Sequence, residues 1–405
     1  MTQLLRLALR NLFRNRVRSM ITLGAILFGV CGLILSGGFV RDIFLQLGEA
    51  LIHSQSGHAQ IGHEAVFSYG SRSPERYLLE APAELRTAIT DQPEVKDVMA
   101  RITFSGLLNN GKTDYAIVGD GVEPEGENRL GTHLHLVSGR MLENDDRFGI
   151  MLGEGVASAL QLGVGDQATL LANTVHGALN TLSLEVVGIF QTFSKDFDAR
   201  AIRIPLSAAQ DLLLTDGVTK FVITLHDTPL TGEFTARMRQ RLPAPLAVHD
   251  WKQLNDFYGK TVDMYNQQFG FLKAMVLLMV CLSVINTVNM SLMERTWEFG
   301  TMRALGNRNR TIAGLIMSEA GMLALLGASL GLALGLSLAM IISGIGIPMP
   351  PPPNADLSYD AYIRIVPEVL LESWLIGLGA TLLAALYPAW RFTRIPIIDA
   401  LRTRE

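Results

Sequence analysis

The stretch GLLNNGKT, residues 106–113, fits the pattern G-x-x-x-x-G-K-[ST] of a nucleotide-binding P-loop. A P-loop holds phosphate only where its glycine-rich turn opens a helix, whose first amides point at the ligand. Here the next residues, DYAIVG at 114–119, continue as a strand-like pattern, and Asn110-Gly111 is a strong signal for a hairpin turn. The sequence therefore predicts a β-hairpin here and no nucleotide site.

The other residues that could do chemistry show no site either. His53, His58 and His63 recur every five residues, which matches neither a helical nor a strand face, and no H-E-x-x-H motif occurs. Cys31 and Cys281 both fall in apolar runs. No nucleophile–base arrangement and no basic, aromatic-rich surface is visible. We expect no catalytic, cofactor-binding or metal site, no enzyme activity in this chain and no nucleic-acid partner.

Long apolar runs predict an α-helical membrane protein. Of the 405 residues, 49% are apolar and only 18% are charged, where a soluble domain carries about 25%. Runs near ~20 residues can cross a ~30 Å hydrocarbon core as helices. Four transmembrane helices are predicted at 19–40, 269–293, 311–343 and 368–390, and their uncharged cores are interrupted only by Glu319. This scarcity of charge argues against ion-coupled transport.

The arginines predict how the chain is oriented. They concentrate in 1–18, which includes an amphipathic helix expected to lie on the lipid surface, in 294–310 and in the tail 391–405. The positive-inside rule places these segments, and so both termini, in the cytoplasm. Residues 41–268 and the proline-rich loop 344–367 then lie outside. We expect a multi-pass membrane protein. The first apolar run is longer than the core of a cleaved signal peptide.

The large segment 41–268 is predicted to be an α/β domain inserted between helices 1 and 2. Two strand–helix–strand patterns, at about 45–100 and 216–265, favour a ferredoxin-like layer with helices on one face. Between them, at about 101–215, short alternating runs bracketed by turn residues favour a β-rich insertion.

Two further patterns point to packing and to a partner. Gly327, Gly331 and Gly335 recur every four residues and predict close helix packing. The loop at 293–310 projects as a helix with two apolar faces. One face holds Met293, Trp297 and Ala304, and the other holds Phe299, Met302 and Leu305. One face can rest on the membrane helices, and we expect a protein partner to cover the second. A plain positive-inside loop would explain only the arginines.

Four stretches give the chain a family resemblance. It resembles the FtsX-like permeases of the MacB and LolC/LolE class of ABC transporters. The stretches are ALRNLFRNRVRSMITLG (8–24), LGEGVASALQLGVGDQATLL (152–171), NTVNMSLMERTWEFGTMRALG (286–306) and YPAWRFTRIPIIDALR (387–402).

The resemblance implies the membrane subunit of a type VII ABC transporter of the mechanotransmission type, located in the cell inner membrane and carrying a MacB-type periplasmic core domain. ATP would be bound by a separate cytoplasmic ATPase, and a lipoprotein, peptide or toxin exported or released. Further implied partners are a second permease chain, identical or paralogous, a periplasmic adaptor or lipoprotein, and membrane lipid. The ATPase would contact the 294–310 loop. The candidate coupling residues are Glu294, Arg295, Trp297, Glu298, Phe299, Met302, Arg303, Leu305 and Gly306. The alternative is a membrane-anchored sensor or scaffold that regulates a periplasmic partner without transport.

Overall fold

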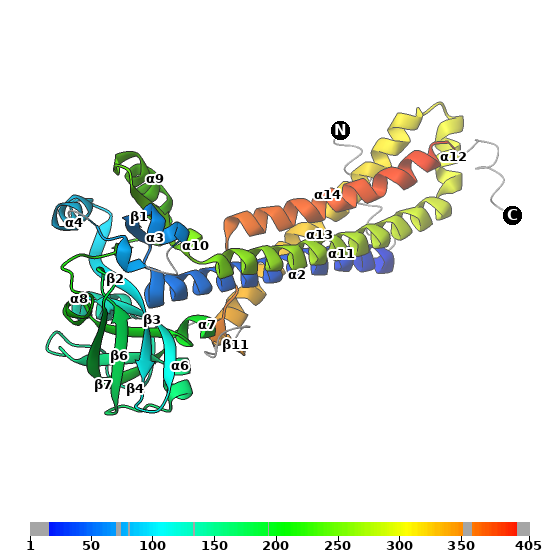
Figure 1. Cartoon of the computed structure of the whole chain (residues 1–405). Helices are drawn as coiled ribbons and strands as arrows, with labels where there is room; N and C mark the ends of the chain where they lie inside the picture. Colours follow the sequence, from blue (N-terminus) through cyan, green and yellow to red (C-terminus); the bar gives the residue numbers. More distant parts are fainter. Residues whose placement is uncertain are drawn as a thin grey trace. The chain divides into compact units, whose positions relative to one another are not determined.

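A computed structural model describes residues 16–69, 74–79, 82–132, 134–192, 194–350 and 359–394 (Figure 1). The chain divides into two compact units. The helical unit comprises the chain up to Phe44, Val262–Met349 and the chain from Asp360, and the sheet unit comprises Leu45–Thr261 and Pro350–Tyr359.

Four long apolar helices confirm the predicted spans. They are α2 (Arg16–Leu51), α11 (Asp256–Glu294), α13 (Asn309–Ile345) and α14 (Pro367–Phe392). Each is long and apolar enough to cross a membrane. The short helix α12 (Thr296–Ala304) lies between α11 and α13. The predicted amphipathic helix falls mostly in residues 1–15, outside the described residues.

Two of the helices extend well beyond the predicted membrane spans. Helix α2 continues past residue 40 to Leu51, and α11 begins at Asp256, before residue 269. The first predicted span stopped before Arg41, whereas a helix continues through charges that have partners or meet water. The predicted loop 344–367 contains two short paired strands, β11 (Ile347–Met349) and β12 (Tyr359–Ala361).

The three regularly spaced glycines lie against α2. A Cβ added at Gly327 would lie 2.9 Å from Ile26 Cβ, and one at Gly331 would lie 2.7 Å from the Leu27 carbonyl oxygen. One at Gly335 would lie 3.2 Å from Ile34 Cβ. At Gly327 and Gly331 the bare backbone of α13 therefore approaches α2 more closely than a side chain would allow, and at Gly335 a side chain would be tightly packed.

The sheet unit is built on ten strands of the described chain. They are β1 (Ala59–His63), β2 (Val95–Asn109), β3 (Asp114–Val122), β4 (His135–Gly139), β5 (Gly149–Gly153), β6 (Gln167–Asn173), β7 (Leu179–Gln191), β8 (Ala201–Pro205), β9 (Lys220–Leu225) and β10 (Leu246–Asp250). Its α-helices are α3 (Glu64–Tyr69), α4 (Pro82–Thr90), α5 (Pro124–Leu130), α6 (Glu154–Leu160), α7 (Lys195–Asp198), α8 (Leu206–Leu213), α9 (Thr231–Arg241) and α10 (Trp251–Leu254). A π-helix (Ile52–Ser56) follows α2, and 3₁₀ turns occur at Pro74–Arg76 and Thr228–Leu230.

One half of this sheet is a ferredoxin-like layer. Its strands run in the order β10-β1-β9-β2, every neighbour pairs antiparallel, and α4 and α9 lie in the two crossovers. This is the β-α-β-β-α-β arrangement that the sequence predicts.

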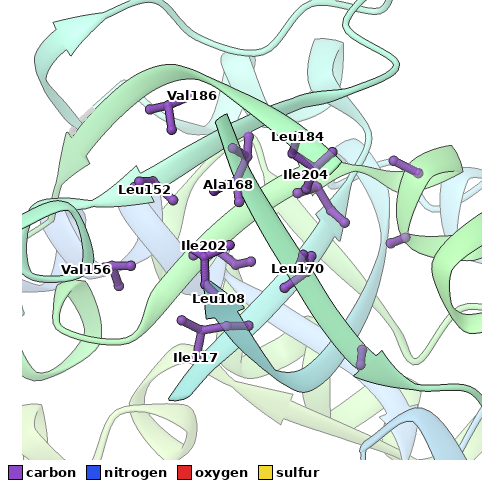
Figure 2. Packing of buried hydrophobic residues seen from close by; sticks show 14 of the residues in the cluster. Leu108, Ile117, Leu152, Val156, Ala168, Leu170, Leu184, Val186, Ile202 and Ile204 are labelled. Atoms are coloured by element: carbon purple, nitrogen blue, oxygen red, sulfur yellow. The ribbon is translucent and has the colours of Figure 1, made fainter. Parts of the chain in front are cut away.

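The other half closes on itself as a barrel. Strand β2 pairs with β3 and β6, β6 with β7, β7 with β5, β5 with β8, and β8 with β3. Figure 2 shows apolar side chains of these strands, among them Leu108, Ile117, Leu170 and Ile202, gathered between them. Closure removes exposed strand edges from the ring.

One strand, β2, crosses the predicted boundary between layer and insertion near residue 101. Residues Val95–Arg101 of β2 pair with β9, and Arg101–Asn109 pair with β3. No break in the chain separates the two halves at residue 101.

The P-loop-like stretch is confirmed as a hairpin. It spans the end of β2 and the turn that leads into β3, and the two strands pair from Asn109↔Asp114 onward. Gly111 has φ +86°, a left-handed conformation that favours glycine. The loop has four residues, 110–113, so the Asn-Gly signal located the turn but not its length.

Candidate functional site

Helix α12 is held to the helical unit by one aromatic side chain. Phe299 is 1% exposed and packs in a cluster with Leu292 of α11, Leu315 of α13 and Phe392 of α14. The rings of Phe299 and Phe392 meet edge to face with centroids 5.4 Å apart, which is a favourable geometry for aromatic pairs. Four helices therefore converge on Phe299.

A buried arginine provides the second attachment. Arg295 Nη1 donates to both carboxylate oxygens of Glu319 on α13, at 2.8 and 3.0 Å, and its Nε donates to Glu298 at 2.9 Å. Its guanidinium also lies over the Phe299 ring, 4.8 Å from the centroid. Burial works against the charged form, but Glu319 and then Glu298 outweigh it and raise the pKa of Arg295. The short helix thus has a fixed orientation.

The opposite side of this segment exposes apolar surface. Met293 is 78% exposed, Trp297 is 46% exposed and Leu305 is 80% exposed. The two predicted faces therefore separate into a buried one with Phe299 and an exposed one with Trp297. We name the exposed residues Met293, Trp297, Ala304 and Leu305 the α12 surface.

Leu305 lies on the other side from the one predicted. Helix α12 ends at Ala304, so the helical projection no longer applies to Leu305. Gly306 has φ +92° and redirects the chain. Of the remaining predicted coupling residues, Met302, Arg303 and Glu298 are half-buried, and Glu294 is exposed. Arg295 and Phe299, which were predicted to contact a partner, are buried.

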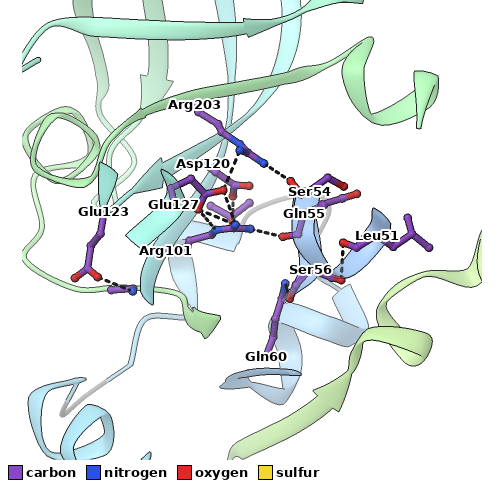
Figure 3. A network of polar contacts seen from close by, with 12 residues as sticks. Leu51, Ser54, Gln55, Ser56, Gln60, Arg101, Asp120, Glu123, Glu127 and Arg203 are labelled. Atoms are coloured by element: carbon purple, nitrogen blue, oxygen red, sulfur yellow. Dashed lines mark hydrogen bonds and ion pairs between the residues drawn. The ribbon is translucent and has the colours of Figure 1, made fainter. Parts of the chain in front are cut away.

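A second polar constellation, which the sequence did not indicate, lies inside the sheet unit (Figure 3). Arg101 on β2 and Arg203 on β8 are both buried and flank Glu127 of α5. Arg101 Nη2 donates to both oxygens of Glu127 at 2.8 Å, and Arg203 Nη1 forms an ion pair with its Oε1 at 2.9 Å. We call Arg101, Arg203 and Glu127 the arginine hub.

The hub contacts the π-helix that ends α2. Arg101 Nη1 donates to the carbonyl of Gln55 at 2.6 Å, and Arg203 Nη2 donates to the carbonyl of Ser54 at 2.7 Å (Figure 3). The Arg203 guanidinium also lies 5.0 Å from the centroid of the Phe190 ring. The signal that could have revealed this site is a lone arginine inside an apolar strand, as in MARITF (99–104) and AIRIP (201–205).

Two further charged residues, Asp120 and Lys220, lie next to the arginine hub. Asp120 on β3 accepts a hydrogen bond from Thr103 at 2.6 Å. Burial works against its ionised form, but Lys220 and Arg101 outweigh burial and lower the pKa of Asp120. Burial lowers the pKa of Lys220 in the same region. The site is thus a compact set of opposite charges in the interior of the sheet unit.

Two family models match the chain. Residues 19–241, more than half of the chain, match the family model described as MacB-like periplasmic core domain. Residues 270–397 match the model described as FtsX-like permease C-terminal.

Individual relatives are ABC transporter permeases. The lipoprotein-releasing system transmembrane protein LolE of Haemophilus influenzae is 23% identical over 383 residues, which cover 90% of this chain and 88% of that protein. LolC of Xylella fastidiosa is 24% identical and covers 78% of this chain and 79% of its own length. The macrolide export ATP-binding/permease protein MacB of Syntrophobacter fumaroxidans is 26% identical, but the match covers 41% of this chain and 21% of that protein. This chain therefore belongs to the MacB-like and FtsX-like permeases, the membrane subunits of ABC transporters of the MacB and LolC/LolE class.

Proposed function

We propose that this chain couples ATP hydrolysis by a separate cytoplasmic ATPase to motion of its sheet unit, by mechanotransmission. The sheet unit would lie on the outer side of the inner membrane, with both termini in the cytoplasm. Its motion would export or release a cargo at the outer face of that membrane. ATP itself would be bound by the partner.

The α12 surface is the observation that carries this proposal. Phe299 and Arg295 fix α12 rigidly to the helical unit, while Trp297 remains 46% exposed on the other side. An exposed tryptophan on a rigid support is typical of the anchor of a protein interface. Because the arginine-rich connection 294–310 is expected on the cytoplasmic side, its partner would be the ATPase of the transporter.

Two continuous helices support transmission from one unit to the other. Helix α2 begins in the helical unit and ends at Leu51 in the sheet unit, and α11 begins at Asp256 in the sheet unit and ends at Glu294 in the helical unit. A helix resists bending and stretching because its backbone is hydrogen-bonded throughout. Movement of either helix would therefore be delivered to the sheet unit along the chain.

The charge that interrupts the predicted span cores is paired with an arginine. Glu319 of α13 pairs with Arg295 next to α12. Ion-coupled carriers place such groups in a cavity near the membrane centre. This arrangement favours a machine whose cargo is handled outside the spans.

We propose a lipoprotein as the cargo, ahead of a peptide or toxin. The relatives named for lipoprotein release align over most of their length and of this chain, whereas the macrolide exporter aligns over a minority of both. A second permease chain, identical or paralogous, and contact with membrane lipid or a periplasmic adaptor are parts of the same proposal.

Replacing Trp297 by alanine tests the coupling role. The chain and its co-purified ATPase would be reconstituted in nanodiscs, and the ATPase concentration for half-maximal stimulation measured. An interface tryptophan contributes about 2 kcal/mol or more, so we expect an increase of roughly 30-fold. Trp390→Ala is the matched control, because Trp390 is 54% exposed on α14 rather than on the α12 surface. Equal effects of both substitutions would refute a specific contact at α12, and a sensor or scaffold would show no stimulation in any variant.

A further inference from the structure

We propose that Arg101 and Arg203, bridged by Glu127, are positioning residues that transmit movement of α2 to both halves of the sheet unit. The inference rests on the proposed mechanotransmission and deepens it by naming the joint. Its basis is the contact between the arginine hub and the π-helix Ile52–Ser56.

The end of α2 is held by its backbone carbonyls. The last carbonyls of a helix have no partner within it and carry the negative end of the helix dipole. Here Arg203 donates a hydrogen bond to the carbonyl of Ser54, and Arg101 donates one to the carbonyl of Gln55. Gln60 Nε2 donates to the carbonyl of Ser56 at 3.0 Å. Ser56 Oγ donates back to the carbonyl of Leu51 at 3.1 Å. A pull on α2 therefore acts directly on groups fixed in the sheet.

The hub lies where the two halves of the sheet meet. Arg101 is opposite Lys220 of β9 in the ferredoxin-like layer and opposite Val122 of β3 in the barrel. Arg203 belongs to β8, a barrel strand, and Glu127 to α5, which follows β3. The π-helix is thus tied to both halves at once, and a displacement of its carbonyls would move the two halves together.

The chemistry of the arginine hub fixes the position of the π-helix more than it stabilises the fold. A buried ion pair gains little net stability, because losing water offsets the attraction. The planar guanidinium fork, however, fixes both distance and angle between its acceptors. Arg101 uses Nε and Nη2 for Glu127 and Nη1 for the carbonyl of Gln55. Arg203 uses Nη1 for the ion pair with Glu127 and Nη2 for the carbonyl of Ser54. An apolar replacement would pack without fixing the position of α2.

The test measures nucleotide-driven distance changes in the full complex with its co-purified ATPase, in nanodiscs. After Cys31 and Cys281 are replaced, spin labels would be placed at exposed positions. One pair, Met20 on α2 and Leu383 on α14, reports movement within the helical unit. A second pair, Lys112 in the β2–β3 hairpin and Leu383, reports movement of the sheet unit.

Two hub variants and one control are compared. Arg101→Met with Arg203→Met removes both carbonyl contacts. Arg203→Lys keeps the charge beside Glu127 but lacks the fork that also reaches Ser54, and it serves as the milder variant if limited proteolysis shows that the double variant does not fold. Arg86→Met is the control, because Arg86 pairs with Glu123 at 2.6 Å in the same unit without touching the π-helix.

The expected result is a selective loss. In the double variant the response of the sheet-unit pair should fall to less than half of the wild-type value, while the helical-unit pair responds as in wild type. Arg203→Lys should show a partial loss and Arg86→Met none. A wild-type response of the sheet-unit pair in a folded hub variant, Arg203→Lys included, would overturn the inference. A wild-type complex in which neither pair responds to nucleotide would overturn the proposed mechanotransmission instead.

Discussion

Replacing Phe299 by alanine is expected to release α12 from the helical unit. Phe299 is 1% exposed, and it packs against α11, α13 and α14. Truncating a buried phenylalanine costs about 3–5 kcal/mol, and the edge-to-face contact with Phe392 accounts for roughly 0.5–1.5 kcal/mol of this. The lower value of about 3 kcal/mol corresponds to a change of roughly 100-fold in an opening equilibrium.

Hydrogen exchange in nanodiscs would measure this opening. Amides of α12 (Thr296–Ala304) should exchange about 100-fold faster in the Phe299→Ala variant, while amides of the sheet unit keep their wild-type rates. Trp297→Ala is the control on the same helix. Trp297 is half-exposed, so its loss should cost roughly 1 kcal/mol or less and change exchange about fivefold at most. Exchange of α12 within a few-fold of wild type in Phe299→Ala would refute the idea that this ring anchors the helix.

Two further predictions concern helix packing and pH. Gly331→Leu should destabilise the chain by about 1–3 kcal/mol, because its Cβ would lie 2.7 Å from the Leu27 carbonyl oxygen. Gly314→Leu is the control, because a Cβ at Gly314 meets nothing within 4 Å. Equal thermal unfolding temperatures of the two variants would contradict this prediction. Burial lowers the pKa of His58 to about 4. The folded state therefore favours the neutral imidazole, and this preference contributes its full stability above about pH 6.5. The contribution to the free energy of unfolding, up to about 3 kcal/mol, should be lost as the pH falls towards 4. His58→Gln should make the thermal unfolding temperature less dependent on pH in this range. Parallel pH profiles of the variant and the wild type would show that His58 does not cause the loss of stability.

The features that follow from local patterns could be predicted from sequence. The four spans, the strand–helix–strand units and the hairpin at Gly111 each depend on residues near one another in the chain. The split of the 293–310 segment into a buried and an exposed apolar face also follows from helical periodicity, and it fails at Leu305 because the helix ends there.

The features that depend on residues far apart in the chain could not be predicted from the sequence. Helix α2 continues past Arg41 because Asp42 is buried and accepts hydrogen bonds from the Tyr362 amide at 2.8 Å and from Arg364 Nε at 3.1 Å, far away in sequence. The barrel closes through the pairing of β2 with β6, which no local sequence pattern predicts. The arginine hub likewise joins residues of β2, β8 and α5.

Purification of the chain from its native membrane in mild detergent tests the central claim most directly. The companions that co-purify would be identified, and ATP hydrolysis by the purified material measured with and without vanadate. The account predicts an ABC ATPase in stoichiometric amount and vanadate-sensitive hydrolysis. Recovery of the intact chain with no ATPase and no vanadate-sensitive hydrolysis would contradict it.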